Sequence, residues 1–262
     1  MSRGTHISAT KAARRCLALR IVLAHSRPDP PAHLAGLEPW IKELSPWEKA
    51  LTERLARSKR AEDLDLAAWQ AEPLHALLHE LGQCDRPAPV DRRVAPESFA
   101  ALESTDPVRF VATARFSDIN LAPNQLWNER LSLQVLIDAG ISAQDMGRAY
   151  WGLSSFEDWI RSVADHFTTH GMFEAIDGDF PAFGLPYRAL DGARRALVHR
   201  IVAERMRAIR WLNGHAPGNK WDRVPESSFD PALLRANQWM IPSQRLQQRP
   251  YAAARAANRR AD

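Results

Sequence analysis

The chain has 262 residues, of which 45% are hydrophobic and 25% are charged, and its net charge is +4. This is enough apolar material for one large core or two packed lobes, and it argues against wholesale disorder. No apolar run approaches the roughly 18 residues that a membrane span needs, so we expect no transmembrane segment.

The positive charge lies at the two ends of the sequence. Residues 1–28 hold six basic residues and no acidic one, and residues 231–262 hold six arginines and one aspartate. The body, 29–230, therefore carries a net charge of −7 within the total of +4. An acidic body is poorly suited to binding nucleic acid, so only the arginine-rich tail remains a candidate for contact with a nucleic acid.

The N-terminus has basic residues before an apolar patch, as secretory signals do. Arg20 interrupts this patch, and no clear cleavage site follows it. We therefore expect a first helix over about 10–24 and a cytoplasmic protein. Cys16 and Cys84 have no metal-ligand or CxxC spacing, so we interpret them as a reduced buried thiol and a loop thiol.

The first half of the chain predicts several helices in succession. A short helix is expected over 37–44, and Ser45 with Glu48 forms a capping-box pattern that opens another. A helix over about 64–81 ends at Gly82, and Pro73 should kink it or mark a new start. Residues 83–106 are polar and Pro-rich, as in a lobe boundary, and the weak alternation over 109–116 predicts a short strand.

The second half predicts helices over 124–139, from Ser154 to about 167, over 191–213, and from Asp230 to about 240. We expect a mainly α, compact multi-helix protein with at most a minor strand element. Its predicted parts are an N-terminal lobe (8–85), a linker (86–120), a C-terminal lobe (121–240) and a basic tail (241–262). The leucine patterns at 14–24 and 128–139, each followed by a Trp-Ile-basic turn, leave internal duplication and chance similarity both open.

The helix over 191–213 contains one contradiction. At about 100° per residue, six apolar side chains share an arc: Ile201, Leu212, Val198, Ile209, Val202 and Met206. Arg205 falls in the middle of this arc, where a guanidinium needs an acid or water. Glu129 is similarly misplaced in the apolar face of the 124–139 helix. We predict a buried Arg205–Glu129 ion pair, with Asp222 or Glu48 as substitutes.

A second group, Glu72, His75 and His79, lies on one face of a predicted helix. Carboxylate and imidazole groups at this spacing are a weak candidate for a metal site. A dinuclear helical-bundle site would need a second Glu-x-x-His, which the sequence lacks. We therefore expect a solvated polar face, no metal and no cofactor.

The irregular stretch 171–190 gathers aromatic residues between glycines and prolines. Long irregular connections often carry function, so we interpret this loop as a protein-binding element. Its candidate residues are Phe180, Phe183, Tyr187, Asp177 and Asp179. The alternative is an ordered loop that covers the core.

Several segments together resemble a known family. They are RCLALRIVLA (15–24), LSPWEKAL (44–51), WQAEPLHALLHELG (69–82), ERMRAIRWLNG (204–214) and KWDRVPES (220–227). They are similar to the bacterial domain-of-unknown-function family 4272, and the resemblance covers about 11–82 and 197–227. It implies a helical bacterial protein and supplies no catalytic residue.

The chain has no GxSxG, Walker or Cys–His motif. We therefore expect a non-catalytic protein that binds a protein partner, in the form of an immunity-type neutraliser whose acidic body covers a basic toxin surface. One alternative is an enzyme whose site assembles around Arg205, the loop 177–187 and Trp221-Asp222. The other is binding of nucleic acid or another anionic partner by the arginine-rich tail.

Overall fold

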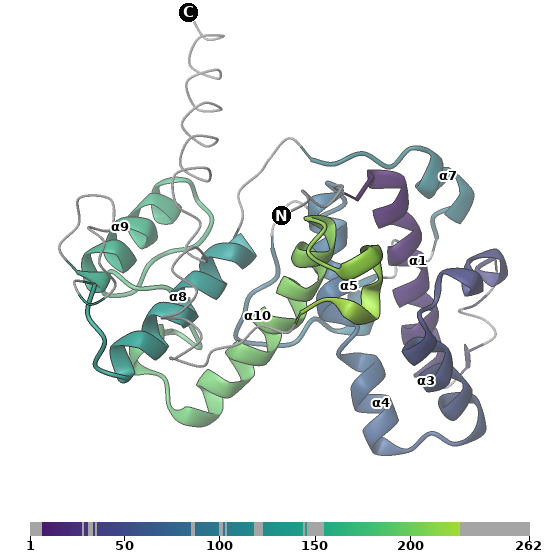
Figure 1. Cartoon of the computed structure of the whole chain (residues 1–262), viewed down its shortest axis with the longest axis horizontal. Helices are drawn as coiled ribbons and strands as arrows, with labels where there is room; N and C mark the ends of the chain where they lie inside the picture. Colours follow the sequence, from purple (N-terminus) through teal and green to yellow (C-terminus); the bar gives the residue numbers. More distant parts are fainter. Residues whose placement is uncertain are drawn as a thin grey trace, which may run out of the picture. The chain divides into compact units, whose positions relative to one another are not determined.

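The computed structural model describes residues 7–27, 29–30, 34, 36–84, 87–99, 102, 104–117, 123–143, 145 and 155–225. This part of the chain is mainly α-helical with one two-stranded sheet, which confirms the predicted fold class. Figure 1 shows the elements along the chain. None of the helices in these ranges has the length and apolar character that crossing a membrane requires.

The chain divides into two compact units. Unit 1 is Met1–Asp118 with Arg200–Ser227, and unit 2 is Ile119–His199 with Ser228–Asp262. The boundary at 118–119 falls inside the predicted linker 86–120. The range 121–240 of the predicted C-terminal lobe is divided between the two units, because residues 200–227 group with unit 1. The helix expected after Asp230 and the basic tail lie outside the described residues.

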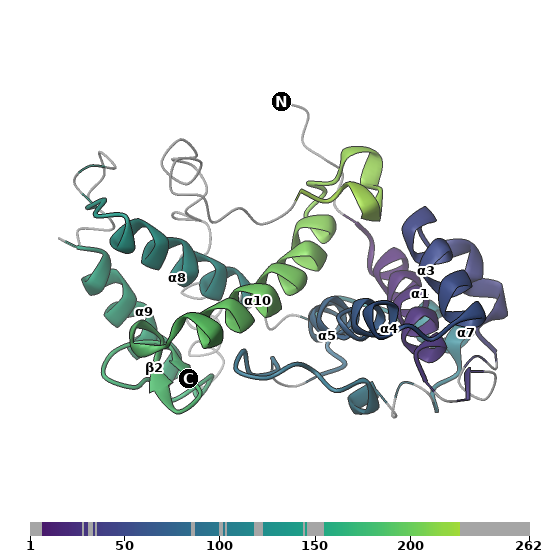
Figure 2. The ribbon, with the colours of Figure 1, turned by 90° about the horizontal axis from the view of Figure 1, so that it is seen from below.

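Unit 1 is built around the helix α1 (Ala9–His25), which contacts most of the other elements of the unit. Those elements are η1 (Glu38–Glu43), α3 (Pro46–Arg57), α4 (Ala61–Ala68), α5 (Ala71–Glu80), η2 (Pro96–Phe99), α7 (Pro107–Ala112), the later part of α10 (Gly192–Leu212), η4 (Pro217–Asn219) and η5 (Trp221–Arg223). Figure 2 shows α1 among α3, α4, α5 and α7. Residues 15–24 of α1 are all buried, as expected for a helix covered on more than one side.

Local signals set the helix boundaries in unit 1. The capping box at the start of α3 is confirmed, because Ser45 accepts from the N–H of Glu48 while the Glu48 carboxylate accepts from the N–H of Ser45. The predicted 64–81 helix is two helices, α4 and α5, and Pro73 lies in the first turn of α5, where a missing N–H is tolerated. Gly82 ends α5 with a φ of +66°.

The expected strand at 109–116 is wrong, because α7 occupies 109–112 and residues 113–116 form a turn and irregular chain. Asp106 caps α7 by accepting from the N–H of Val108 at 3.0 Å, and Pro107 is at its first position. Both are strong helix-start signals, and they outweigh a weak alternation of side chains.

Unit 2 contains α8 (Pro123–Asp138), α9 (Phe156–Thr169), β1 (Pro181–Ala182), β2 (Leu185–Pro186), η3 (Tyr187–Ala189) and the start of α10. The helices α8 and α9 pack around a core that includes Leu133, Leu136, Phe156, Trp159 and Ile160. The N-cap of α9 is Ser155, one residue later than predicted, and its hydroxyl accepts from the N–H of Asp158 at 3.1 Å.

Two tight turns shape the aromatic loop of unit 2. Asp177 and Gly178 have φ values of 51° and 68°, and Phe183 and Gly184 have φ values of 56° and 70°. Positive φ at both central residues is the signature of a type I′ turn, the turn that best fits the twist of a hairpin. The first turn lies between Ile176 and Asp179, which pair with each other in an antiparallel β-bridge, and the second turn connects β1 to β2. The loop is therefore a double hairpin.

The two cysteines have the predicted environments. Cys16 is fully buried in α1, and burial raises the pKa of its thiol far above the ordinary value. Cys84 is half-buried in the stretch that follows Gly82.

Candidate functional site

Arg205 is buried in unit 1, as its place on the arc of α10 predicts. Its side chain is 1% exposed, and its Nε donates to Glu72 Oε2 at 2.8 Å. The other two nitrogens donate to the carbonyl oxygens of Ala88 and Pro89 at 2.6 and 2.9 Å. Glu72 Oε1 accepts from the N–H of Val94 at 2.7 Å. The ion pair therefore fixes the segment 87–94, and all three nitrogens of Arg205 have structural partners.

The predicted ion pair between Arg205 and Glu129 is wrong. The acid is Glu72, on α5 of the same unit, whereas Glu129 belongs to α8 of unit 2. Helical spacing identifies which charge is buried, but it does not identify which buried acid on another helix meets it. The sequence places Glu72 on a polar helix face with His75 and His79, a pattern that predicts exposure to solvent and not burial.

Neither substitute acid pairs with Arg205. Glu48 forms a buried ion pair with Arg15, which also donates to the carbonyl oxygen of Glu43 at 3.1 Å. Asp222 accepts from the N–H of Trp47 at 3.2 Å near the start of α3.

Glu129 remains unusual in its own unit. It is 4% exposed, and its Oε1 has no hydrogen-bond partner within the described part of the chain. Burial raises the pKa of its carboxyl well above the ordinary value. A protonated, neutral Glu129 is therefore the form that the core of unit 2 favours.

The group of Glu72, His75 and His79 is not the solvated face that we expected. Glu72 and His79 are both buried, and Glu72 is occupied by Arg205. Burial, and then the charges of Arg205 and His79, lower the pKa of His75 to about 4. Among the described residues, no group of three His, Cys, Asp or Glu side chains is placed to hold a metal ion.

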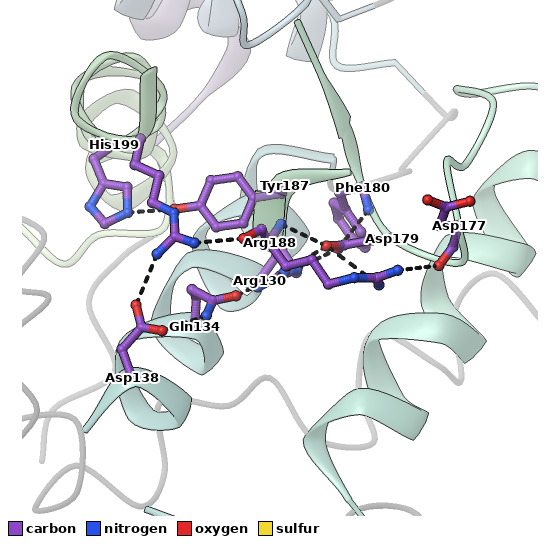
Figure 3. Close-up of polar contacts among 10 residues, drawn as sticks. Arg130, Gln134, Asp138, Asp177, Asp179, Phe180, Tyr187, Arg188 and His199 are labelled. Atoms are coloured by element: carbon purple, nitrogen blue, oxygen red, sulfur yellow. Dashed lines mark hydrogen bonds and ion pairs between the residues drawn. The ribbon is translucent and has the colours of Figure 1, made fainter. Parts of the chain in front are cut away.

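In unit 2, Asp179 connects the double hairpin to α8. Arg130 Nε donates to Asp179 Oδ1 at 2.7 Å, and Arg130 Nη2 donates to Oδ2 at 2.8 Å (Figure 3). The same carboxylate accepts from the N–H groups of Phe180 and Arg188, at 2.7 and 2.9 Å. Burial raises the pKa of Asp179, but the bonds from Arg130 and these two N–H groups outweigh it and hold the pKa below the ordinary value.

The network continues outward along α8. Gln134 accepts from Arg130 Nη2 at 3.1 Å and donates to Asp138 at 2.7 Å. Asp138 pairs with Arg195 at 3.1 Å, and Arg195 donates to the carbonyl oxygen of Arg188 at 2.6 Å. Figure 3 shows that these contacts link α8, the hairpin and the start of α10. A chain of charge-assisted bonds thus holds unit 2 in one arrangement.

Tyr187 lies against this network with its hydroxyl 2.8 Å from His199 Nε2. The guanidinium of Arg130 stacks over the Tyr187 ring at 4.7 Å. Burial raises the pKa of Tyr187 to about 12, and burial, followed by the charge of Arg195, lowers the pKa of His199. At neutral pH the pair is therefore a neutral phenol and a neutral imidazole, which suits structural hydrogen bonding.

These contacts correct the prediction of an exposed, partner-binding aromatic loop. Phe180, Tyr187 and Asp179 are buried inside unit 2, where they cannot touch a partner without unfolding the loop. Phe183 is half-buried and Asp177 is exposed. The alternative, an ordered loop that covers the core, describes Phe180, Tyr187 and Asp179, whose side chains are buried.

A feature that the sequence did not single out is a hollow in unit 1 around two tryptophans. We call it the tryptophan hollow, and it is lined by residues of α1, η1, α3, α10 and the segment 219–223. Its lining includes Trp211, Trp221, Pro46, Lys11, Lys220 and Arg223, and its volume is about 410 Å³. A second hollow of about 500 Å³ adjoins it and shares Trp221 and Asp222.

Comparison with protein-family models, with curated proteins and with solved structures gives no significant match to this chain. The resemblance to family 4272 therefore stays a prediction, and the site has to be interpreted from its own chemistry.

Proposed function

We propose that this protein acts by binding a protein partner through the tryptophan hollow of unit 1. The observation that carries the proposal is a hollow with three exposed cations on its rim, whose shape two buried and packed tryptophans hold fixed. Each part of this combination has a separate physical basis.

The floor of the hollow is aromatic and held in place. The rings of Trp211 and Trp221 meet edge to face with centroids 5.5 Å apart, and Trp211 Nε1 donates to the carbonyl oxygen of Asn219 at 3.1 Å. Arg15 and Arg207 lie over the Trp221 ring at 4.5 and 4.8 Å. Trp211 and Trp221 are 2% and 4% exposed, so their packing fixes the shape of the hollow and offers a partner little ring surface. A hollow whose shape is fixed in advance loses little conformational entropy on binding.

The rim of the hollow carries Lys11, Lys220 and Arg223. All three are exposed, and none has an ion pair within the described part of the chain. Lys11 lies 5.8 Å from the centre of the Trp211 ring. Within the described residues these cations have no ion pair, and cations in this state beside an apolar surface favour a ligand that combines negative charge with an apolar group.

The second hollow indicates the size of this ligand. The two hollows have Trp221 and Asp222 in common as lining residues, so they adjoin, and an extended segment reaches both where a compact small molecule does not. Glu43, Glu204 and Asp222 also line this surface, and they repel a ligand with closely spaced negative charges, as in a nucleic acid, more than a segment whose single acidic groups can contact Lys11, Lys220 or Arg223. The occupant that fits best is an acidic protein segment with an apolar anchor residue.

The earlier functional hypotheses change accordingly. The toxin-neutralising role was inferred from the acidic body and from an exposed aromatic loop, and three residues of that loop, Phe180, Tyr187 and Asp179, are buried. The present proposal therefore names the chemistry of the partner and not a toxin. The enzyme alternative depended on Arg205 as a binding group, and its three nitrogens are occupied. The arginine-rich tail, 241–262, lies outside the described residues.

The test is affinity purification of the full chain from its native host, followed by quantitative mass spectrometry. A rim variant, Lys220→Glu with Arg223→Glu, is compared with the wild-type protein. A control variant, Arg109→Glu with Arg115→Glu, makes the same charge change at exposed residues of unit 1 that line neither hollow.

We expect a partner that the wild-type and control proteins recover equally and that the rim variant loses. Binding should weaken with rising salt, because the rim contacts are electrostatic and solvent-exposed. A partner retained equally by the rim variant contradicts the proposal. Recovery of RNA that nuclease treatment removes, in place of a protein, also contradicts it.

A further inference from the structure

Unit 2 has a cavity of about 270 Å³ beside the Arg130–Asp179 ion pair. Cavities that hold drug-sized ligands are roughly 300–1,000 Å³, so this one suits a smaller molecule. Three arginines line it: Arg130 from α8, Arg161 from α9 and Arg188 from the end of the double hairpin. Their partners, or lack of partners, indicate what the cavity can bind.

Arg161 has no ion pair within the described part of the chain. It follows Glu157 by four residues on α9, a spacing that favours an ion pair between the two side chains. Arg161 instead lies against Gly178 of the first turn: a Cβ added there would be 3.2 Å from its Cγ and 3.4 Å from its Nε. The absence of a side chain at Gly178 thus leaves room for Arg161 at the edge of the cavity.

Arg188 is held at the cavity by the hairpin. Its Nη2 donates to the carbonyl oxygen of Asp177 at 2.9 Å, and its Nη1 is 4.0 Å from Asp179 Oδ2. The side chain is 52% exposed, so it keeps donors available to a ligand. Arg130 is buried, and its Nη1 has no hydrogen-bond partner among the described residues.

The charges of the cavity do not cancel. Asp179 is neutralised by its two bonds to Arg130, which leaves Arg161 and Arg188 against Glu157. Ile137 and Ile160 supply an apolar part of the lining. The cavity therefore has a surplus positive charge at one side and an apolar surface for the body of a small molecule.

We propose that this cavity binds a small organic anion through Arg161 and Arg188, with a short aliphatic body against Ile137 and Ile160. The planar guanidinium matches carboxylate and phosphate groups equally well, so the chemistry of the anion is shared between these two sources. Glu157 limits the negative charge that the site tolerates and favours a monoanion. This site is separate from the tryptophan hollow and does not depend on its function.

The test is isothermal titration calorimetry of the full chain with two probes, pentanoate and butyl phosphate. We expect saturable binding of at least one probe, and the stronger of the two identifies the anionic group. The variant Arg161→Gln with Arg188→Gln should bind this probe about tenfold more weakly or worse, because each charge-assisted bond contributes about that factor. The control Arg194→Gln alters an exposed arginine of unit 2 outside the cavity lining and should bind as the wild type does.

A second variant separates loss of the site from loss of the fold. Glu157→Gln removes a like charge from the cavity and should tighten binding of the same probe, an effect that misfolding cannot produce. The proposal is overturned by absence of binding of both probes to the wild type. It is equally overturned by unchanged binding to the double arginine variant, or by weaker binding to Glu157→Gln.

Discussion

Units 1 and 2 each attach an irregular segment to a helix through a buried arginine–carboxylate pair, but the pairs are built differently. In unit 1, Arg205 and Glu72 both belong to helices, and the segment 87–94 contributes only backbone groups. In unit 2, the acid itself, Asp179, belongs to the hairpin, and only Arg130 comes from a helix.

This difference determines what a mutation leaves behind. A buried carboxyl that loses its base can take up a proton and become neutral, whereas a guanidinium that loses its acid stays charged. Asp179 also orders its own loop through two N–H groups, so its removal disturbs both the ion pair and the turn. The comparison therefore predicts a ranked series of effects on stability.

The largest effect is expected for Asp179→Ala. This change leaves Arg130 charged and buried and removes the acceptor of two backbone N–H groups, so unit 2 should lose about 3–5 kcal/mol of unfolding free energy. The pKa of Asp179 is held below its ordinary value, so wild-type Asp179 is ionised throughout pH 5–8 and the loss should be constant there.

Urea unfolding with hydrogen exchange resolved by unit is the measurement for Asp179→Ala. Asp177→Ala is the matched control, because Asp177 is an exposed aspartate two residues away in the same turn. A loss for Asp179→Ala no larger than that of the control would show that the buried pair does not hold the hairpin.

Arg205→Met should have a somewhat smaller effect, about 3 kcal/mol, because Glu72 loses its base but still accepts from the N–H of Val94. Urea unfolding gives the loss of unfolding free energy. Hydrogen exchange should report faster opening over 87–94, because two carbonyl oxygens of this segment lose their donor. Unchanged exchange over 87–94 would contradict the role of this ion pair in holding the segment.

Glu129→Gln should change the unfolding free energy in the opposite direction and stabilise unit 2. The pKa of Glu129 is raised above 4.5, so the folded protein retains a proton that the unfolded chain releases, and stability falls as pH rises above that value. Each pH unit in this window costs about 1.4 kcal/mol. The variant should be more stable than the wild type by about 1–3 kcal/mol at pH 7, and the difference should vanish near pH 4. Thermal unfolding at the two pH values checks this, and equal stability at pH 7 would contradict it.

The smallest effect is expected for Asp138→Asn, at the outer end of the Arg130 network. Asp138 pairs with Arg195, but its side chain is 52% exposed. Exposed pairs contribute about 0–1 kcal/mol, and salt reduces this further. Urea unfolding at low and high salt gives the measurement. A loss as large as that of Asp179→Ala would mean that connection to the network, and not burial, sets the energy.

Periodicity and capping predicted a large part of the fold. The arc of α10, the burial of Arg205, the capping box at Ser45 and the stop at Gly82 are all present, because each depends on residues within one or two helical turns. The strand at 109–116 was wrong although the right signal, Asp106-Pro107, directly precedes it.

The candidate sites were harder to predict, because they depend on contacts between distant residues. Arg205 and Glu72 are 133 positions apart, and Arg130 and Asp179 are 49 apart. Spacing along one helix carries no information on such pairs. Asp177-Gly178 is a hairpin-turn signal that the sequence contains, whereas Phe183-Gly184 is not one. The tryptophan hollow had no comparable local signal.

The two cysteines described above differ in their accessibility, so a thiol reagent can label one of them selectively. Cys16 is fully buried with a raised thiol pKa, so it offers neither access nor thiolate to an alkylating reagent. Cys84 is half-buried outside the helices, and the chain has two cysteines in all. A maleimide dye or spin label will therefore attach to the folded protein at Cys84 alone. Unfolding of unit 1 will expose the thiol of Cys16 as a second labelling site. The average number of labels per chain, between one and two, therefore measures the fraction of molecules in which unit 1 has unfolded.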